Sequence, residues 1–127
     1  MKSGNVIDLL SQLVQIPSIN PTLNPQGSEV AIVEYCASIL AAREFEVELV
    51  PVSRGRTNVL GWIRGGKQGL LVCESHLDTV PESHESCAFD IRDGKRYGCG
   101  ACDTKVSGAA MITATQVLAA DVHLMRD

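Results

Sequence analysis

The stretch LLVCESHLDTVP, residues 70–81, carries the strongest indication of the fold in this 127-residue chain. It opens within a continuously apolar run, Gly69–Cys73, which is typical of a central strand buried on both faces of a sheet. The run leads into His76 and Asp78, which would lie just beyond the carboxyl end of that strand. Open α/β sheets usually carry their functional sites at this edge, so we expect both side chains to face a site.

A second polar stretch, YGCGACDTK at residues 97–105, precedes the last expected helix. Its glycines allow the backbone to approach a site closely. Asp103 in this stretch has two interpretations, because a carboxylate there can bridge two divalent ions or simply cap the helix that follows. His76 and Asp78 are also ambiguous by themselves. An imidazole oriented by a carboxylate is a good zinc ligand, but H-x-D is also a common pattern of surface loops.

The rest of the chain alternates between helical and strand patterns. Apolar residues recur at helical spacing in three segments, and others show the alternation or the apolar run of a strand. This mixture predicts an α/β domain. The expected elements are helices at 6–16, 28–43 and 107–120, strands at 45–51, 58–63 and 69–73, and a hairpin that turns at Asp93-Gly94. The last helix should direct five residues to the core, namely Ala110, Met111, Ala114, Val117 and Leu118.

The composition fits one soluble globular domain and excludes several classes of protein. Hydrophobic residues make up 45% of the chain and charged residues 20%. The net charge of −4 argues against binding to the phosphate backbone of nucleic acids. No apolar run approaches the roughly 20 residues of a membrane span, and the N-terminus does not resemble a signal peptide. We therefore expect a cytoplasmic protein without nucleic-acid or membrane partners.

The cysteines leave one alternative open. Their number, five, is odd, and the chain is not otherwise a small disulfide scaffold, so reduced thiols are expected. Cys99 and Cys102 nevertheless have the C-x-x-C spacing of redox pairs. A small thiol-disulfide protein that uses Cys99 and Cys102 is therefore one alternative function.

Together and in this order, the two polar stretches resemble the N-terminal part of the M20 metallopeptidase family. Supporting matches are QIPSINP at 15–21, NVLGWIRG at 58–65 and AAM at 109–111. The segment ACDTK at 101–105 is most similar to the acetylornithine deacetylase-like branch, to which succinyl-diaminopimelate desuccinylases are related. The resemblance extends over almost the whole chain.

This resemblance implies a three-layer αβα, zinc-peptidase-like catalytic domain in which helices cover both faces of a mixed sheet. It implies a metal-dependent amidohydrolase that acts on N-acyl amino acids or small peptides. Two Zn²⁺ ions would occupy each complete site, and Co²⁺ or Mn²⁺ could replace them. His76 would be a ligand of one metal, Asp103 the carboxylate that bridges both, and Asp78 the catalytic-site residue that orients His76. The bond between Asp103 and Thr104 would be a cis peptide, and the full-length enzyme would be a homodimer.

The sequence also departs from the family pattern. Cys99 stands where an Arg is usual, and Val106 and Ser107 stand where two glycines are usual. The adjacent Glu-Glu pair of the family, one a general base and one a ligand, occurs nowhere in the chain. We therefore expect residues 1–127 to be the N-terminal portion of a catalytic domain, without the lid and dimerisation domain or the C-terminal part, and inactive alone. A catalytically silent metal-binding or vestigial module is the first alternative to this function, ahead of the thiol-disulfide protein.

Overall fold

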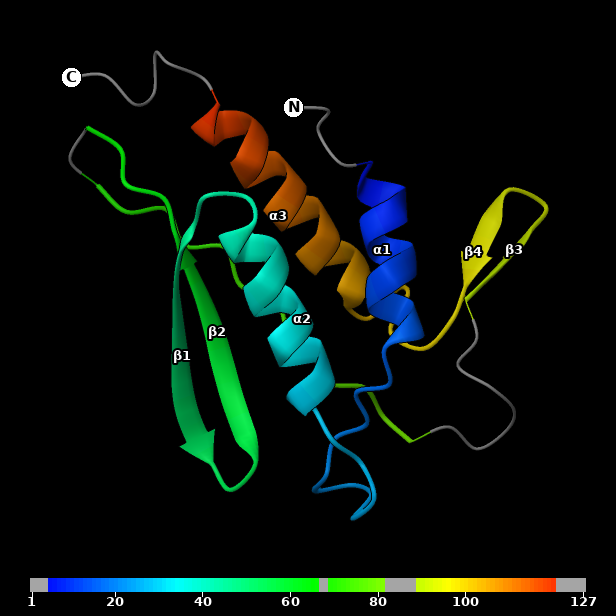
Figure 1. Ribbon diagram of the computed structural model, residues 1–127. Coiled ribbons are helices and arrows are strands. Elements are labelled where there is room, and N and C mark those ends of the chain that lie inside the picture. Colours follow the sequence, from blue (N-terminus) through cyan, green and yellow to red (C-terminus); the bar gives the residue numbers. More distant parts are fainter. Residues whose placement is uncertain (1–4, 67–68, 82–88, 121–127) are drawn as a thin grey trace.

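The computed structural model describes residues 5–66, 69–81 and 89–120. Within these residues, three helices lie between two small hairpins (Figure 1). None of the described helices is long and apolar enough to cross a membrane. The elements are α1 (Val6–Gln15), α2 (Val30–Ala41), β1 (Glu46–Ser53), β2 (Arg56–Trp62), β3 (Asp90–Arg92), β4 (Lys95–Tyr97) and α3 (Lys105–Ala119).

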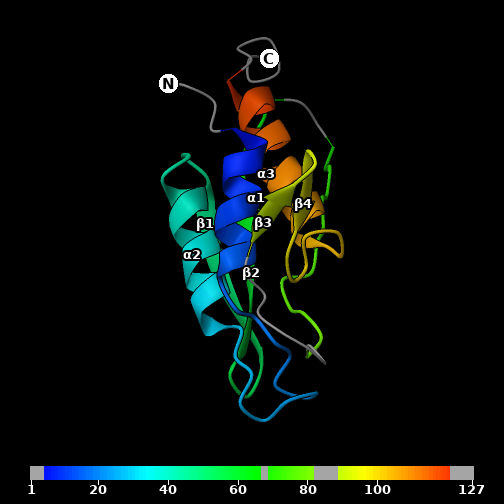
Figure 2. The ribbon, with the colours of Figure 1, turned by 90° about the vertical axis from the view of Figure 1, so that its right-hand side faces the viewer.

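Helix α1 supplies most of the hydrophobic core. Its N-terminus is capped by Asn5, whose side chain accepts a hydrogen bond from the Ile7 backbone N–H at 3.0 Å. Helix α3 packs beside α1, and α2 contributes to the same core from another side (Figure 2). The buried cluster consists of Leu9, Leu10, Leu13 and Val14 from α1, Ile32 and Cys36 from α2, and Ala109 from α3.

Strands β1 and β2 form an antiparallel hairpin that packs against α2. The pairing runs from Glu46–Trp62 to Ser53–Arg56, with one irregularity near the turn. Gly61 allows the hairpin to approach the helix, because a Cβ there would lie 3.0 Å from the Phe45 side chain and 3.1 Å from that of Leu40. The predicted strands at 45–51 and 58–63 are therefore confirmed, with small shifts at their ends.

The expected hairpin turn at Asp93-Gly94 is also confirmed. Strands β3 and β4 pair in antiparallel register on either side of it. Both turn residues have positive φ, +50° at Asp93 and +71° at Gly94. Asp and Gly tolerate this left-handed conformation better than most residues, which explains why this dipeptide is a strong turn signal.

The expected central strand at Gly69–Cys73 is wrong in this structure. The segment has no regular secondary structure, and its apolar side chains are largely exposed: 74% for Leu70, 80% for Leu71 and 69% for Val72. A strand buried on both faces needs neighbouring strands for its backbone groups, and no described segment pairs with this one. The described residues thus form two separate antiparallel hairpins in place of one mixed sheet.

The loop after α1 runs alongside the chain that follows His76. A parallel β-bridge joins Ile19 and Thr79. The Thr79 N–H donates to the Ser18 carbonyl at 2.9 Å, and the Asn20 N–H donates to the Thr79 carbonyl at 2.9 Å. The Ser18 hydroxyl also donates to the carbonyl of Leu77 at 2.7 Å. Two segments almost sixty residues apart are therefore held in register, although neither belongs to a sheet.

Helix α3 directs a different face to the core from the one expected. Lys105 and Ala109 are buried, and Ile112 packs against the core cluster. Four of the five residues expected to point inward are exposed: Ala110, Ala114, Val117 and Leu118. The helix has apolar residues on more than one face, and only the face that packs against α1 is buried.

The cysteines differ from the expected state at one position. Cys99 is disulfide-bonded, whereas Cys36, Cys73 and Cys102 are free thiols. The expectation of reduced thiols is therefore wrong at Cys99. Because Cys102 is free, the two cysteines of the C-x-x-C motif do not form a disulfide with each other. This arrangement does not favour the redox alternative that depends on Cys99 and Cys102.

Lys105 is a charged residue in the core, with 1% of its surface exposed. Its Nζ donates a hydrogen bond to the Ile16 carbonyl at 2.9 Å. This contact links the start of α3 to the end of α1. Burial lowers the pKa of Lys105 to about 8, although the nearby Cys36 thiol acts in the opposite direction.

The difference in burial between two leucines can be tested by truncation. Leu13 is 1% exposed and Leu71 is 80% exposed. We expect Leu13→Ala to lower the free energy of unfolding by about 2–5 kcal/mol, because it leaves a cavity in the core. Leu71→Ala should change it by less than about 0.5 kcal/mol. Urea denaturation measures both, and equal losses would show that residues 69–73 are buried after all.

The buried amine of Lys105 should make stability depend on pH. Its lowered pKa means that the folded chain loses this proton at a lower pH than the unfolded chain. The free energy of unfolding of the wild type, relative to Lys105→Met, should therefore rise from pH 7 to pH 10, by roughly 2–3 kcal/mol. Denaturation of both proteins across this range provides the measurement. A constant difference would contradict the burial of a titrating amine.

Candidate metal site

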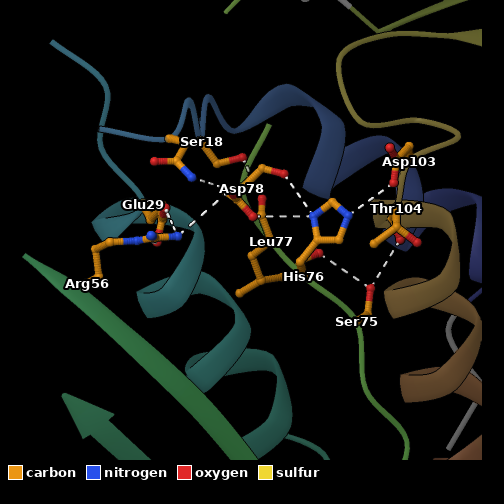
Figure 3. A network of polar contacts seen from close by, with 10 residues as sticks. Ser18, Glu29, Arg56, Ser75, His76, Leu77, Asp78, Asp103 and Thr104 are labelled. Atoms are coloured by element: carbon orange, nitrogen blue, oxygen red, sulfur yellow. Dashed lines mark hydrogen bonds and ion pairs between the residues drawn. The ribbon is translucent and has the colours of Figure 1, made fainter. Parts of the chain in front are cut away.

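His76 and Asp103 face each other although they are 27 residues apart. The imidazole Nε2 lies 3.0 Å from the Asp103 Oδ1 (Figure 3). Asp103 is joined to Thr104 by a cis peptide bond, as expected, and Thr104 directly precedes α3. The structure therefore brings together the two side chains that the sequence predicted to meet.

Asp78 lies on the other side of the same imidazole. The His76 Nδ1 is 3.1 Å from the Asp78 backbone carbonyl and 3.3 Å from its Oδ1. The two acceptors at Nδ1 hold a proton there, and the Asp103 oxygen favours a second proton on Nε2 in the metal-free ring, which a metal ion bound at Nε2 would replace. Figure 3 shows the ring between the two acidic residues. This is the arrangement that an imidazole ligand with an orienting carboxylate requires.

A further group of polar residues contacts Asp78 on the side away from His76. The Asn20 side-chain Nδ2 donates to the Asp78 Oδ2 at 2.7 Å. The Arg56 Nη2 is 3.8 Å from the same Oδ2 and 2.9 Å from the Glu29 Oε1. These roles were not among the sequence predictions. Asn20 lies in QIPSINP, so its motif could have drawn attention to it, whereas nothing in the sequence pattern singles out Arg56 or Glu29.

The three predicted site residues differ in their access to water. The side chain of Asp103 is 88% exposed, that of His76 52% and that of Asp78 25%. Partial burial lowers the pKa of the His76 imidazole, but hydrogen bonds and charges from Asp103 and Asp78 raise it more. The net pKa therefore lies above the usual value for histidine.

A cavity of about 380 Å³ opens beside His76. Ser75 shapes its wall, because its hydroxyl donates to the Thr104 carbonyl at 3.2 Å and so connects the two polar stretches. Ser107, one of the departures from the family pattern, lines the cavity, whereas Val106 is partly exposed. The residues around the cavity are Glu74, Ser75, His76, Asp103, Thr104, Ser107 and Met111.

Gly100 is one of the glycines expected to permit a close approach of the backbone. Its φ is +72°, and a Cβ there would lie 2.9 Å from the Thr79 Cγ2 and 3.1 Å from the Lys105 Cδ. A side chain at this position would therefore displace the segment that carries Asp103. Backbone here is held against both the Thr79 segment and the start of α3.

The donor atoms present fit part of a metal site. An imidazole nitrogen and a carboxylate oxygen are ordinary zinc ligands, and their 3.0 Å separation suits two ligands of one ion at about 2.0–2.2 Å each. Among the described residues, no group of three or more His, Cys, Asp or Glu side chains gathers closely enough to hold a metal ion. His76 and Asp103 are thus two candidate ligands, and the described residues do not complete a coordination shell around them.

The site lies within a segment that matches a known family. Residues 72–124 match the sequence profile of peptidase family M20/M25/M40. The matched segment contains His76, Asp78 and Asp103. The resemblance to the M20 family seen in the sequence is therefore confirmed over this part of the chain.

Curated relatives agree with this assignment. The chain is 34% identical to an acetylornithine deacetylase of Proteus mirabilis over 90% of its own length and 31% of the relative's. It is 35% identical to an acetylornithine deacetylase of Photorhabdus laumondii, over 85% and 30%. It is 32% identical to a succinyl-diaminopimelate desuccinylase of Acinetobacter baumannii, over 91% and 30%. The chain spans less than a third of the length of each of these relatives.

The contact between His76 and Asp103 can be tested without metal. Because the Asp103 hydrogen bond raises the pKa of His76, Asp103→Asn should lower that pKa. NMR titration of the imidazole protons, with His76→Gln to identify the signal, provides the measurement. Asp93→Asn is the matched control, because Asp93 is exposed in the β3–β4 turn and should leave the pKa unchanged. Equal effects of the two variants would contradict the contact.

Proposed function

We propose that this chain supplies part of the metal centre of a hydrolase that cleaves the amide bond of N-acyl amino acids or small peptides. The observation that carries the proposal is the placement of the His76 imidazole between Asp78 and Asp103. The relatives support the reaction class, since their names describe removal of an acetyl or a succinyl group. The three residues lie inside the segment that matches the family.

The chain's own residues would divide the work as follows. His76 would bind a divalent ion through Nε2 while Asp78 holds the proton on Nδ1. Asp103, which is largely exposed, would bind the same ion and present its second oxygen to another. The ions would be Zn²⁺, with Co²⁺ or Mn²⁺ as substitutes, and they would polarise the amide carbonyl. Lys105 and Ser75 would keep the start of α3, and therefore Asp103, in place.

We also propose that residues 1–127 correspond to the N-terminal portion of a three-layer αβα catalytic domain. The exposed apolar segment 69–73 supports this proposal, because pairing within a larger sheet would bury it. The share of each relative that the chain covers is in keeping with it. The expected homodimer and cytoplasmic location stay predictions, as does the absence of nucleic-acid and membrane partners.

A silent metal-binding module is the second candidate function. It is favoured by the small number of donor atoms that the described residues bring together. A catalytic zinc site usually has three protein ligands, and His76 and Asp103 provide two. The silent module and the hydrolase share the same metal ligands, so turnover separates them and metal binding does not.

Metal binding and turnover of the 127-residue chain test these roles. We expect Co²⁺ or Zn²⁺ to bind, and His76→Ala and Asp103→Ala each to weaken binding by at least about tenfold, since each removes one of two ligands. Asp93→Asn should bind like the wild type. Isothermal titration calorimetry provides the measurement. Binding that is unchanged in both alanine variants would rule out this site.

Turnover should be absent from the same preparation. The Glu-Glu pair that supplies the general base in the resembled family does not occur in the chain, and such a base is typically worth about 10²–10⁴-fold. The described residues also leave the ligand set incomplete. The assay uses N-acetyl and N-succinyl amino acids with the metal-loaded chain. Hydrolysis that disappears in both His76→Ala and Asp103→Ala would show that residues 1–127 contain a working site, and the expected inactivity would then be wrong.

A further inference from the structure

The two carboxylate oxygens of Asp78 have different partners. Oδ1 lies 3.3 Å from the His76 Nδ1, whereas Oδ2 accepts a hydrogen bond from the Asn20 Nδ2 at 2.7 Å. The terminal torsion of an aspartate is broad, so the carboxylate can rotate unless something holds it. The short bond to Asn20 fixes one oxygen and thereby determines where the other one points.

Asn20 is itself held in one orientation. Its Oδ1 accepts a hydrogen bond from the Thr22 N–H at 2.8 Å, so its NH₂ group must face the opposite way, towards Asp78. Its backbone N–H donates to the Thr79 carbonyl at 2.9 Å, which anchors the residue beside the segment that carries Asp78. Asn20 is therefore a fixed donor and not a mobile surface amide.

Arg56, the other polar neighbour of the Asp78 Oδ2, has a different role from Asn20. The Arg56 guanidinium makes its closest contacts with Glu29, at 2.9 Å and 3.1 Å, and stays 3.8 Å from the Asp78 Oδ2. Arg56 therefore adds positive charge near the carboxylate, whereas Asn20 makes the short directional bond. Asp78 is also the least exposed of the three predicted site residues, which protects this bond from competition by water.

From these contacts we infer that Asn20 is a positioning residue of the metal site, which holds the Asp78 carboxylate so that its free oxygen faces the Nδ1 of His76. This inference rests on the proposed function, because it assumes that Nε2 of the same ring binds metal. Asn20 would touch neither the metal nor the substrate. It would act through Asp78 on the tautomer and the orientation of the ligand.

The chain offers a matched control in the same loop. Asn24 is half-buried like Asn20, and its Oδ1 accepts from the backbone N–H of Gln26 at 3.0 Å, two residues further on, as that of Asn20 does from Thr22. Among the described residues, Asn24 makes no hydrogen bond to Asp78. Asn20→Asp and Asn24→Asp both keep the local acceptor and add one negative charge. Only Asn20→Asp places that charge against Asp78.

The experiment measures Co²⁺ affinity by calorimetry and the His76 tautomer by ¹⁵N NMR of the metal-free chain, at one alkaline pH. We expect Asn20→Asp to weaken Co²⁺ binding by roughly tenfold, which is the lower end of the loss found when a hydrogen-bond partner of a metal ligand is changed. The same substitution should lower the fraction of imidazole protonated at Nδ1. Asn24→Asp should match the wild type in both. A purely structural role for Asn20 would not change the tautomer in a chain that stays folded.

Each remaining outcome counts against one idea. If Co²⁺ binds through His76 and Asn20→Asp stays within about twofold of Asn24→Asp, the positioning role is wrong while the proposed function stands. If wild-type binding does not depend on His76, the proposed function fails. In that case the His76 tautomer alone tests the positioning role of Asn20, and an unchanged tautomer in Asn20→Asp overturns that role. Should Asn20→Asp fail to fold, Asn20→Ala with Asn24→Ala as its control replaces the pair, with a smaller loss expected because no charge is added.

Discussion

The candidate site depends on the backbone pairing between the loop after α1 and the segment that follows His76. The Thr79 N–H and carbonyl are both bonded to this loop, through Ser18 and Asn20. These bonds fix the position of Asp78 relative to the end of α1, although neither segment lies in a sheet. They also bring the amide of Asn20 within 2.7 Å of the carboxylate. Without this pairing, the segment that carries His76 would lack backbone partners, since residues 69–73 pair with no strand among the described residues.

A second link, through Lys105, fixes the opposite side of the site. Its buried Nζ bonds the Ile16 carbonyl, so the same end of α1 anchors both the loop that holds Asp78 and the helix start that follows Asp103. A buried lysine is costly, and its pKa is lowered to about 8 as a result. The buried lysine helps to position the site, since two acidic residues from distant parts of the chain are held on either side of one imidazole.

Much of the local structure could be predicted from the sequence because it depends on neighbours along the chain. The Asp93-Gly94 turn and the β1–β2 hairpin follow from short-range sterics and hydrogen bonds. The burial of Gly69–Cys73 could not be predicted in this way. An apolar run indicates that a segment can be buried, but burial requires partner strands that no local pattern provides. The face of α3 was misjudged for the same reason.

The sequence by itself determined the two hairpins and the turn chemistry, and through its resemblance to the M20 family it predicted His76, Asp78 and Asp103 as the residues of a metal site. Tertiary structure alone decided the distances at which His76 meets the two carboxylates and brought Asn20 and Arg56 next to Asp78. The physical reason is range. Propensities and motifs act over a few residues, whereas these contacts join segments separated by 27 and 58 positions and depend on how α1 packs.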